Sequence, residues 1–156
     1  FCCENNLYAM GTALARSEAQ TDLCAKAASY AVPTLKADGM DIVAVHEAMK
    51  LATAHVRDGL GPFFLELQTY RFRAHSMFDP ELYRDKAEVE EWKTRGPLHT
   101  FSARLKAEDK LSEKEFLKLD AQAEKEVAAA VDFAERAELE SVNDLLTDVY
   151  TPAVAP

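Results

Sequence analysis

Apolar residues form three short runs of strand length in the first half of the chain. The first is Phe1 to Cys3, which meets a polar turn at Glu4-Asn5-Asn6. Residues 35–37 form a second short extended segment, and residues 63–70 form a third run that is rich in aromatic side chains. Short apolar runs bounded by turn residues predict buried strands.

Between the second and third runs, apolar residues recur at the spacing of one helix face. Asp41 is suited to cap this helix at its start, and Gly59 stands just past its last turn. The recurring positions are Ile42, Val45, Met49, Ala52 and Val56. A strand, a helix and a second strand predict a parallel sheet with flanking helices, and therefore an α/β fold.

The second half of the chain has helical patterns only. Residues 87–93 and 98–107 suit two short helices separated by Gly96-Pro97. Ser112 and Glu115 have the spacing of a capping box, which opens a long helix that runs to about residue 137. A short helix over 142–149 and a frayed tail over 152–156 follow. We expect an α/β domain over 1–85, a helical carboxyl-terminal region over 86–150, and a tail over 151–156.

Composition excludes several classes of protein. The 156 residues are 48% hydrophobic and 29% charged, which is typical of one globular domain. No apolar run approaches the ~20 residues that span a bilayer, and no leader pattern is visible, so neither membrane insertion nor secretion is expected. The net charge of −9 argues against nucleic-acid binding. The chain begins without Met, as an internal piece of a longer protein would.

The charge is divided unevenly along the chain. Residues 1–78 carry 7 Lys/Arg and 8 Asp/Glu, whereas residues 79–156 carry 11 and 19. The acidic half therefore suits a solvated helical surface. Cys2, Cys3 and Cys24 have no metal-site spacing, and we expect reduced, buried thiols.

Three features of the sequence contain residue types that suit ligand binding or catalysis. The Asn5-Asn6 turn offers neutral oxygen ligands of the kind that suit Mg²⁺, or it satisfies only its own backbone. The basic segment with Arg71, Arg73 and His75 is suited to a phosphate group, or it is a solvated loop. Residues 79–84 either order that loop or form the turn that leads into the next helix.

Together these segments resemble a known family in sequence and in order. The matching segments are Glu4-Asn5-Asn6-Leu7-Tyr8-Ala9-Met10-Gly11-Thr12, Ala37-Asp38-Gly39-Met40-Asp41, Glu66-Leu67-Gln68-Thr69-Tyr70-Arg71, His75-Ser76-Met77, Asp79-Pro80 and Tyr83-Arg84. They resemble the alpha subunit of the pyruvate dehydrogenase first component, a thiamine diphosphate-dependent 2-oxo acid dehydrogenase. The resemblance implies a partial thiamine diphosphate-binding fold and marks the chain as the carboxyl-terminal part of that subunit.

The resemblance also implies residue roles. Asn6 would give its side-chain oxygen and Tyr8 its backbone carbonyl to Mg²⁺, which clamps the cofactor diphosphate. His75 would be the catalytic residue and would contact the cofactor. The residues that order the loop and receive the lipoyl domain would be Arg71, Asp79, Tyr83 and Arg84. Ser76 matches a position that is phosphorylated in mitochondrial members.

Two departures from the family pattern stand out. The aspartate of the family's GDG motif is absent, and Arg73 replaces a histidine that many relatives have. The implied activity is oxidative decarboxylation of pyruvate with acyl transfer to lipoyllysine. We expect this piece of the subunit to be inactive alone. The alternatives are an acetoin or branched-chain 2-oxo acid dehydrogenase alpha subunit, or a noncatalytic assembly fragment.

The resemblance further implies partners and a compartment. The partners would be a beta subunit in a heterotetramer and the lipoyl domain of the dihydrolipoyl acyltransferase. The expected compartment is the bacterial cytoplasm, with the mitochondrial matrix as the alternative.

Overall fold

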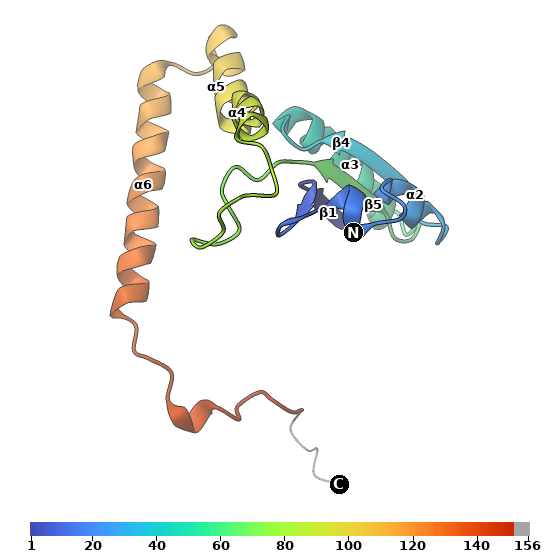
Figure 1. Ribbon diagram of the computed structural model, residues 1–156. Coiled ribbons are helices and arrows are strands. Elements are labelled where there is room, and N and C mark those ends of the chain that lie inside the picture. Colours follow the sequence, from blue (N-terminus) through green and yellow to red (C-terminus); the bar gives the residue numbers. More distant parts are fainter. Residues whose placement is uncertain (152–156) are drawn as a thin grey trace. The chain divides into compact units, whose positions relative to one another are not determined.

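The computed structural model describes residues 1–151 (Figure 1). The chain divides into two compact units, the first of which is Phe1–Leu111, while the second begins at Ser112. Two helices that the sequence assigned to the helical region, α4 (Lys86–Thr94) and α5 (Pro97–Ala107), lie within the first unit. The proposed boundary at residue 85 stays a prediction, and the predicted tail over 152–156 lies outside the described residues.

The first unit is built on a parallel sheet of three strands. These are β1 (Cys2–Asn5), β4 (Thr34–Asp38) and β5 (Phe64–Gln68), in the order β1-β5-β4. Asn5 and Asp38 both pair with Gln68 in the register, so the carboxyl ends of the three strands lie level. This confirms the predicted α/β fold with a parallel sheet.

The central strand β5 forms the core. Leu65 and Leu67 are buried against Ala48 of α3 (Ile42–Arg57), whereas Glu66 between them contacts Cys24 of α2 (Leu23–Ala28). Successive side chains of a strand point to opposite faces. The two helices therefore cover opposite faces of the sheet (Figure 1).

The turn from β4 into α3 is tied to the end of β5. The Gly39 N–H donates to the Gln68 carbonyl at 2.8 Å, and a Cβ on Gly39 would lie 2.5 Å from Thr69 Cγ2. Only glycine fits so close an approach. Asp41 caps α3 as predicted, accepting hydrogen bonds from the Val43 and Ala44 N–H groups.

Four short elements were not predicted. These are α1 (Leu14–Ser17), α2, and the antiparallel pair of β2 (Tyr8–Ala9) with β3 (Thr12–Ala13). Each is too short to carry a clear periodicity. The predicted thiols are free, but Cys2 is exposed and the other two are half-buried, so the expectation of buried thiols was wrong. Cys2 lies on the edge strand β1, which pairs with a neighbouring strand on one side only.

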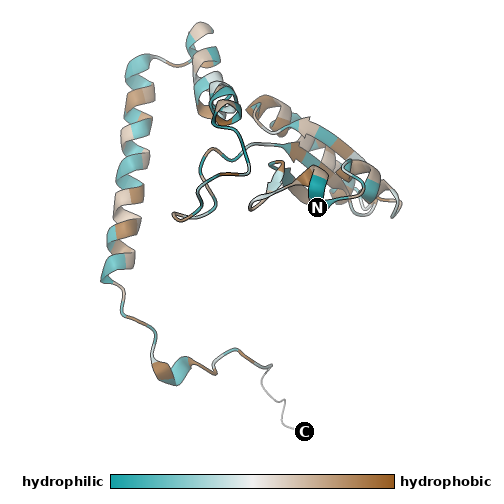
Figure 2. Cartoon of the chain, viewed as in Figure 1, coloured by the Kyte–Doolittle hydropathy of each residue, from teal (hydrophilic) through white to brown (hydrophobic). Residues whose placement is uncertain are grey.

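The second unit contains the long helix α6 (Glu113–Arg136), which begins at the predicted capping box of Ser112 and Glu115. Hydrophobic and hydrophilic residues alternate along it (Figure 2), and none of its residues is buried. The predicted helix over 142–149 is wrong, because only a 3₁₀ turn, η1 (Val142–Asp144), forms there. A short helix needs tertiary packing, and the apolar side chains of Leu145, Leu146 and Val149 are exposed. Among the described residues, no helix is long and apolar enough to cross a membrane.

Candidate functional site

A cavity of about 220 Å³ lies beyond the carboxyl end of the sheet in the first unit. Ligand sites of α/β proteins are typically found at this end of the strands. The lining residues are Asn6, Tyr8, Met10, Arg71, Arg73, His75, Tyr83 and Arg84. The structure therefore brings the predicted residues of the Asn5-Asn6 turn together with those of the segment over 71–84. Asp79 and Ser76 of that segment do not line the cavity.

One wall of the cavity is the turn that follows β1. The Oδ1 of Asn5 accepts from the Leu7 N–H, and the Oδ1 of Asn6 accepts from the Tyr8 N–H, each at 3.1 Å. Leu7 has a φ of 72°, an uncommon conformation for a residue with a branched side chain. Its carbonyl accepts from the Leu14 N–H at 2.8 Å. The side chains of both asparagines thus bond to the backbone of a strained turn and stabilise it. Hydrogen bonding of this kind is what the purely structural interpretation of the Asn5-Asn6 turn predicts.

Tyr8 is fixed by its own side chain. Its hydroxyl donates to the Glu88 carboxylate of α4 at 3.0 Å, and its ring lies 5.5 Å from that of Tyr83. Burial, followed by the hydrogen bond to Glu88, raises the pKa of Tyr8 to about 12. The phenol therefore stays protonated and anchors the Tyr8 backbone beside Asn6.

The opposite wall is the loop between β5 and α4, and Arg84 holds its start. The Arg84 side chain is 3% exposed and pairs with the Glu81 carboxylate. Its guanidinium donates to the carbonyls of Arg71 at 2.5 Å and of Phe72 at 3.3 Å. These contacts use the guanidinium donors, so Arg84 organises the loop and does not offer a free fork to a ligand.

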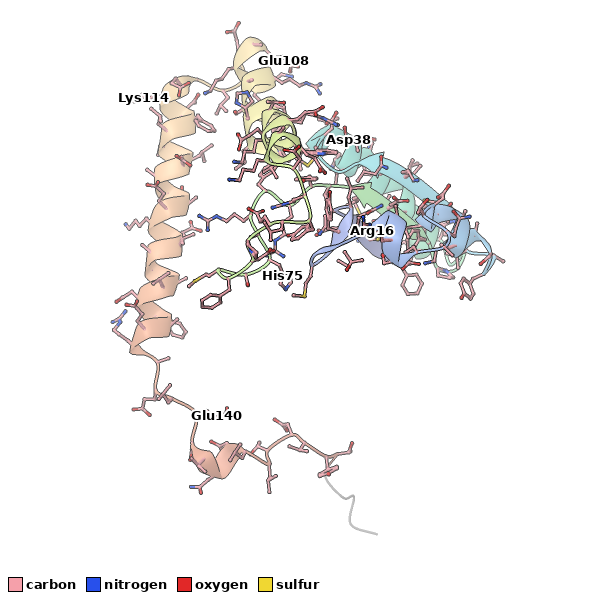
Figure 3. The ribbon with its side chains drawn as sticks, in the orientation of Figure 1. Arg16, Asp38, His75, Glu108, Lys114 and Glu140 are labelled. Atoms are coloured by element: carbon pink, nitrogen blue, oxygen red, sulfur yellow. The ribbon has the colours of Figure 1, made fainter. Side chains whose placement is uncertain are left out.

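His75 lies on the same loop (Figure 3) and contacts Arg71. The Arg71 guanidinium is 2.9 Å from His75 Nδ1 and also donates to the His75 carbonyl at 3.4 Å. Since a guanidinium has no acceptor, Nδ1 accepts this bond, and the proton of the neutral ring is on Nε2. The contact makes His75 a hydrogen-bond donor through Nε2.

Asp79 fastens the middle of the loop. Its carboxylate accepts from the Glu81 N–H at 2.9 Å, the Tyr83 hydroxyl at 2.8 Å and the His75 N–H at 3.2 Å. The bonds from Glu81 and Tyr83 hold the pKa of Asp79 below its usual value. Ser76 is exposed, and its hydroxyl accepts from the Phe78 N–H at 3.3 Å.

The lining residues fit an anionic ligand with a bound cation. Arg71, Arg73 and His75 supply positive or donating groups, and none of the residues that line the cavity is acidic. Such groups bind phosphate oxygens well. The Asn6 side-chain oxygen and the Tyr8 carbonyl are hard oxygen donors of the type that Mg²⁺ prefers. Two neutral oxygens are an incomplete ligand set for that ion.

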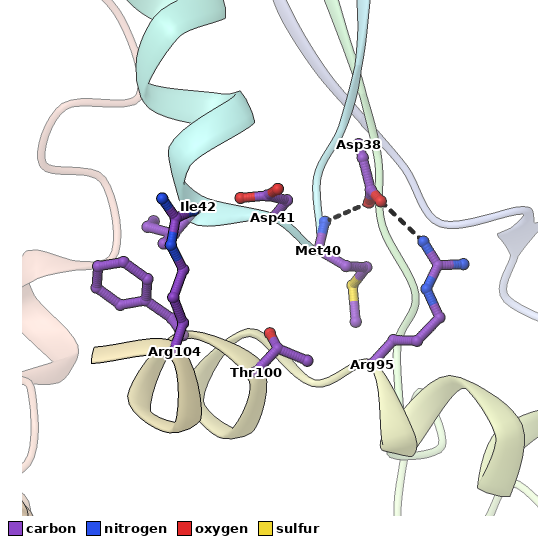
Figure 4. A pocket seen from close by; sticks show the side chains of 8 residues that line it. Asp38, Met40, Asp41, Ile42, Arg95, Thr100 and Arg104 are labelled. Atoms are coloured by element: carbon purple, nitrogen blue, oxygen red, sulfur yellow. Dashed lines mark hydrogen bonds and ion pairs between the residues drawn. The ribbon is translucent and has the colours of Figure 1, made fainter. Parts of the chain in front are cut away.

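A second cavity of about 220 Å³, between the β4–α3 turn and α5, was not predicted. The Asp38 carboxylate there accepts from the Met40 N–H and from the Arg95 guanidinium, each within 2.9 Å (Figure 4). Of the charged residues that line it, Asp38 and Arg95 pair with each other, whereas Asp41 caps α3 and Arg104 pairs with Glu108. The Asp38–Arg95 pair therefore connects the end of α4 to the sheet. The cavity does not present charge of a single sign to a ligand.

Sequence reasoning missed several residues of the first cavity and its support. Met10 and Glu88 were not singled out, whereas Arg73 was named in the basic segment suited to a phosphate group and also as a departure from the family pattern. Asn5 was named only as part of the turn that offers oxygen ligands, and Glu66 was quoted in a matching segment without a role. The one local signal was Glu66, a charged residue in the middle of an apolar strand.

The chain matches the family model of the dehydrogenase E1 component over residues 1–143. The chain belongs to the dehydrogenase E1 component family. It is 41% identical over 150 residues to the pyruvate dehydrogenase E1 component subunit alpha of Rhizobium meliloti, covering 96% of this chain and 43% of that protein. The corresponding subunit of Zymomonas mobilis is also 41% identical, over 96% of this chain and 42% of that protein.

A mitochondrial relative is equally similar to this E1 family chain. The type I mitochondrial form of Ascaris suum is 42% identical, over 98% of this chain and 39% of that protein. The chain thus spans about two fifths of the length of the curated relatives that it matches. The resemblance to pyruvate dehydrogenase alpha subunits is confirmed, and these relatives include bacterial and mitochondrial proteins.

Proposed function

We propose that this chain is part of the alpha subunit of a thiamine diphosphate-dependent pyruvate dehydrogenase. The observation that carries the proposal is the cavity in which Asn6 and Tyr8, after one strand, face Arg71 and His75, after the neighbouring strand. The names of its relatives favour pyruvate over acetoin and branched-chain 2-oxo acids as the substrate.

In this proposal, one wall of the cavity binds the metal ion and the other binds the cofactor. The Asn6 side-chain oxygen and the Tyr8 carbonyl hold Mg²⁺, and the basic loop holds the anionic end of the cofactor. When bound, thiamine diphosphate supplies the nucleophilic carbon and the electron sink for decarboxylation. His75 donates a hydrogen bond through Nε2 at the cofactor, and Arg71 keeps the ring in that tautomer.

The two oxygen ligands of this chain do not complete the coordination of Mg²⁺. Mg²⁺ is usually held by at least one carboxylate, and no cavity-lining residue supplies one. In the proposal, the carboxylate comes from a segment outside these 156 residues, where the family's GDG motif is expected. Alone, the chain is then inactive and binds the cofactor weakly.

The proposal extends to partners and compartment. The full protein pairs with a beta subunit in a heterotetramer and passes the acyl group to a lipoyl domain, which the loop with Asp79, Tyr83 and Arg84 receives. Ser76, exposed beside His75, is the proposed phosphorylation position. A phosphate there would add negative charge next to the arginines and rearrange the loop. The proposed compartment is the bacterial cytoplasm, with the mitochondrial matrix as the alternative.

The test uses the full-length protein paired with its beta subunit. We expect lipoyl reductive acylation with pyruvate and much lower rates with acetoin or a branched-chain 2-oxo acid. Calorimetry of the Asn6→Ala complex is expected to show a loss of Mg²⁺-dependent thiamine diphosphate affinity of at least ten-fold. A preference for acetoin would contradict the substrate assignment. Unchanged affinity in Asn6→Ala would contradict the metal assignment.

A further inference from the structure

Glu66 is a buried carboxylate at the centre of the sheet. It is 1% exposed and lies on β5 between Leu65 and Leu67, which are 2% and 7% exposed. A buried carboxylate is costly unless hydrogen bonds and an opposite charge compensate it. The partners of Glu66 therefore indicate what keeps it in this position.

Three side chains contact the two oxygens of Glu66. The Asn5 amide donates to Oε1 at 2.9 Å, the Cys24 thiol donates to Oε2 at 3.4 Å, and the Lys36 ammonium is 3.4 Å from Oε2. Lys36 is also 3.5 Å from the carboxylate of Asp22. Burial opposes the ammonium charge, but the two carboxylates outweigh it and raise the pKa of Lys36.

This cluster does not have the chemistry of a metal site. Asp22, Cys24 and Glu66 place one potential ligand atom each within 4.8 Å of one another. However, the Lys36 ammonium already contacts both carboxylates and supplies the cation. Burial and the contact with Glu66 raise the pKa of Cys24, so its sulfur is a thiol donor and not a thiolate ligand. The cluster acts as a closed hydrogen-bonding network.

The network fixes which way the Asn5 amide faces. The hydrogen bond to Glu66 Oε1 is donated by the Asn5 side-chain nitrogen, so this nitrogen faces Glu66. The Asn5 oxygen then faces the Leu7 N–H, with which it bonds at 3.1 Å. Leu7 is the residue with positive φ that separates Asn6 from Tyr8.

We infer that Glu66 is a positioning residue, which acts through Asn5 to hold the Asn6 side-chain oxygen and the Tyr8 carbonyl in place for a bound cation. This inference rests on the proposed function, because the cation site is part of that proposal. Glu66 contacts Asn5, and neither residue lines the cavity. Groups that orient metal ligands in this way typically account for 10–100-fold in metal affinity.

The test is Glu66→Gln in the full-length protein paired with its beta subunit. Glutamine keeps the size, but its amide presents either an oxygen or a nitrogen to Asn5, so the turn loses its unique arrangement. With thiamine diphosphate saturating, calorimetric titration of Mg²⁺ is expected to show roughly ten-fold weaker binding. At saturating Mg²⁺, kcat is expected to change less than two-fold, because no reacting group is altered.

Asp22→Asn is the matched control. It removes a carboxylate from the same network and from the same lysine, but Asp22 has no contact with Asn5. Asparagine also remains a good cap for α2, where Asp22 accepts from the Ala25 N–H. We expect Mg²⁺ affinity in this variant to stay within two-fold of the wild type.

Asn5→Ala keeps the inference testable if Glu66→Gln does not fold. It is expected to weaken Mg²⁺ binding by a similar factor, and the double variant is expected to lose no more than Asn5→Ala alone. Effects that multiply in the double variant would overturn the inference, because Glu66 would then not act through Asn5. A folded Glu66→Gln protein with wild-type Mg²⁺ affinity would overturn it as well.

Hydrogen exchange of the metal-free protein separates this inference from the proposed function. Glu66→Gln is expected to speed exchange of the Leu7 and Tyr8 amides at least five-fold, while Leu65 and Leu67 stay protected. If the wild type binds no cofactor but the exchange rates change as expected, the proposed function fails and the positioning of the turn stands. If those rates are unchanged, Glu66 does not position the turn.

Discussion

The two walls of the cavity are held by different means. The Asn5–Tyr8 turn continues directly from a strand, and its first side chain bonds to the buried Glu66 in the sheet. The loop over 71–84 is largely exposed, and its own side chains hold it through Arg84 and Asp79. One wall is therefore part of the core, whereas the other is a local polar network.

This difference suits the two proposed tasks. A metal site needs ligands fixed by packed supporting groups, which the sheet provides. A loop that receives a partner domain benefits from an arrangement with a lower opening free energy. If this interpretation is correct, substitutions in the polar network should release the loop without unfolding the sheet.

The largest effect is expected from Arg84→Met. The change leaves the carbonyls of Arg71 and Phe72 without their donor and removes a buried charge from beside Glu81. We expect a loss of about 2 kcal/mol in the free energy that holds the loop closed. Trypsin cleavage after Arg71 and Arg73 should become more than ten-fold faster, while circular dichroism of the sheet and helices is retained.

Arg104→Met is the control for this experiment. Its guanidinium forms an exposed pair with Glu108 at the end of α5, so the cleavage rate in the loop should be unchanged. If Arg84→Met unfolds the whole chain cooperatively, the loop is not a separate unit of stability, and the contrast between the two walls is wrong.

A smaller effect is expected from Tyr8→Phe, which cuts the link between the first wall and α4. The hydroxyl bond to Glu88 joins residues that are 80 positions apart. Its loss should lower the free energy of unfolding by about 1 kcal/mol, measured by urea denaturation. Tyr30→Phe is the control, since the Tyr30 side chain is 82% exposed and should show no change. An equal effect in both variants would indicate that the Glu88 bond contributes nothing.

The parts of this fold that sequence predicted are those with local causes. The strand over 64–68 and the helix that begins after Asp41 follow from periodicity and capping within a few residues. Asn6, Tyr8 and His75 were candidates because their motifs are contiguous. The long-range pair of Tyr8 with Glu88 leaves no local signal, so only the folded chain reveals it.

The failures also have physical causes. The helix α2 is missed because Ala-Lys-Ala-Ala offers no apolar stripe, and Asp22 is its only clear start signal. The helix expected over 142–149 does not form, and its apolar side chains are exposed, although a short helix needs packing to be stable. The role of Glu66 depends on four elements that meet in the fold, namely β1, α2, β4 and β5.

Acid should loosen the loop. The pKa of Asp79 is lowered in the folded chain, chiefly by the hydrogen bond from the Glu81 N–H and then by that from Tyr83. The carboxylate therefore stabilises the closed loop at pH values above about 4, its ordinary pKa, and this contribution is lost as pH falls through the lowered value. Pepsin cleavage within 71–84 should accelerate over that range.

Asp79→Asn provides the comparison for the pH experiment. Its amide does not titrate, so loop cleavage should already be faster than in the wild type and should lack the rise on acidification. The same rise in both proteins would assign the acid sensitivity to another group and would remove Asp79 from the network that closes the loop.

The smallest expected effect concerns the tautomer of His75 and leaves the fold unchanged. In the wild type, Arg71 donates to Nδ1, so the neutral ring should show protonation at Nε2 alone in ¹⁵N NMR spectra. Arg71→Met removes the donor, and a population with the proton on Nδ1 should become measurable. Arg73→Met is the control, because Arg73 lines the same cavity, and it should leave the ring spectrum unchanged. If Arg71→Met and the wild type give the same spectrum, the loop does not set the proton position on His75, and its part in orienting this proposed catalytic residue is lost.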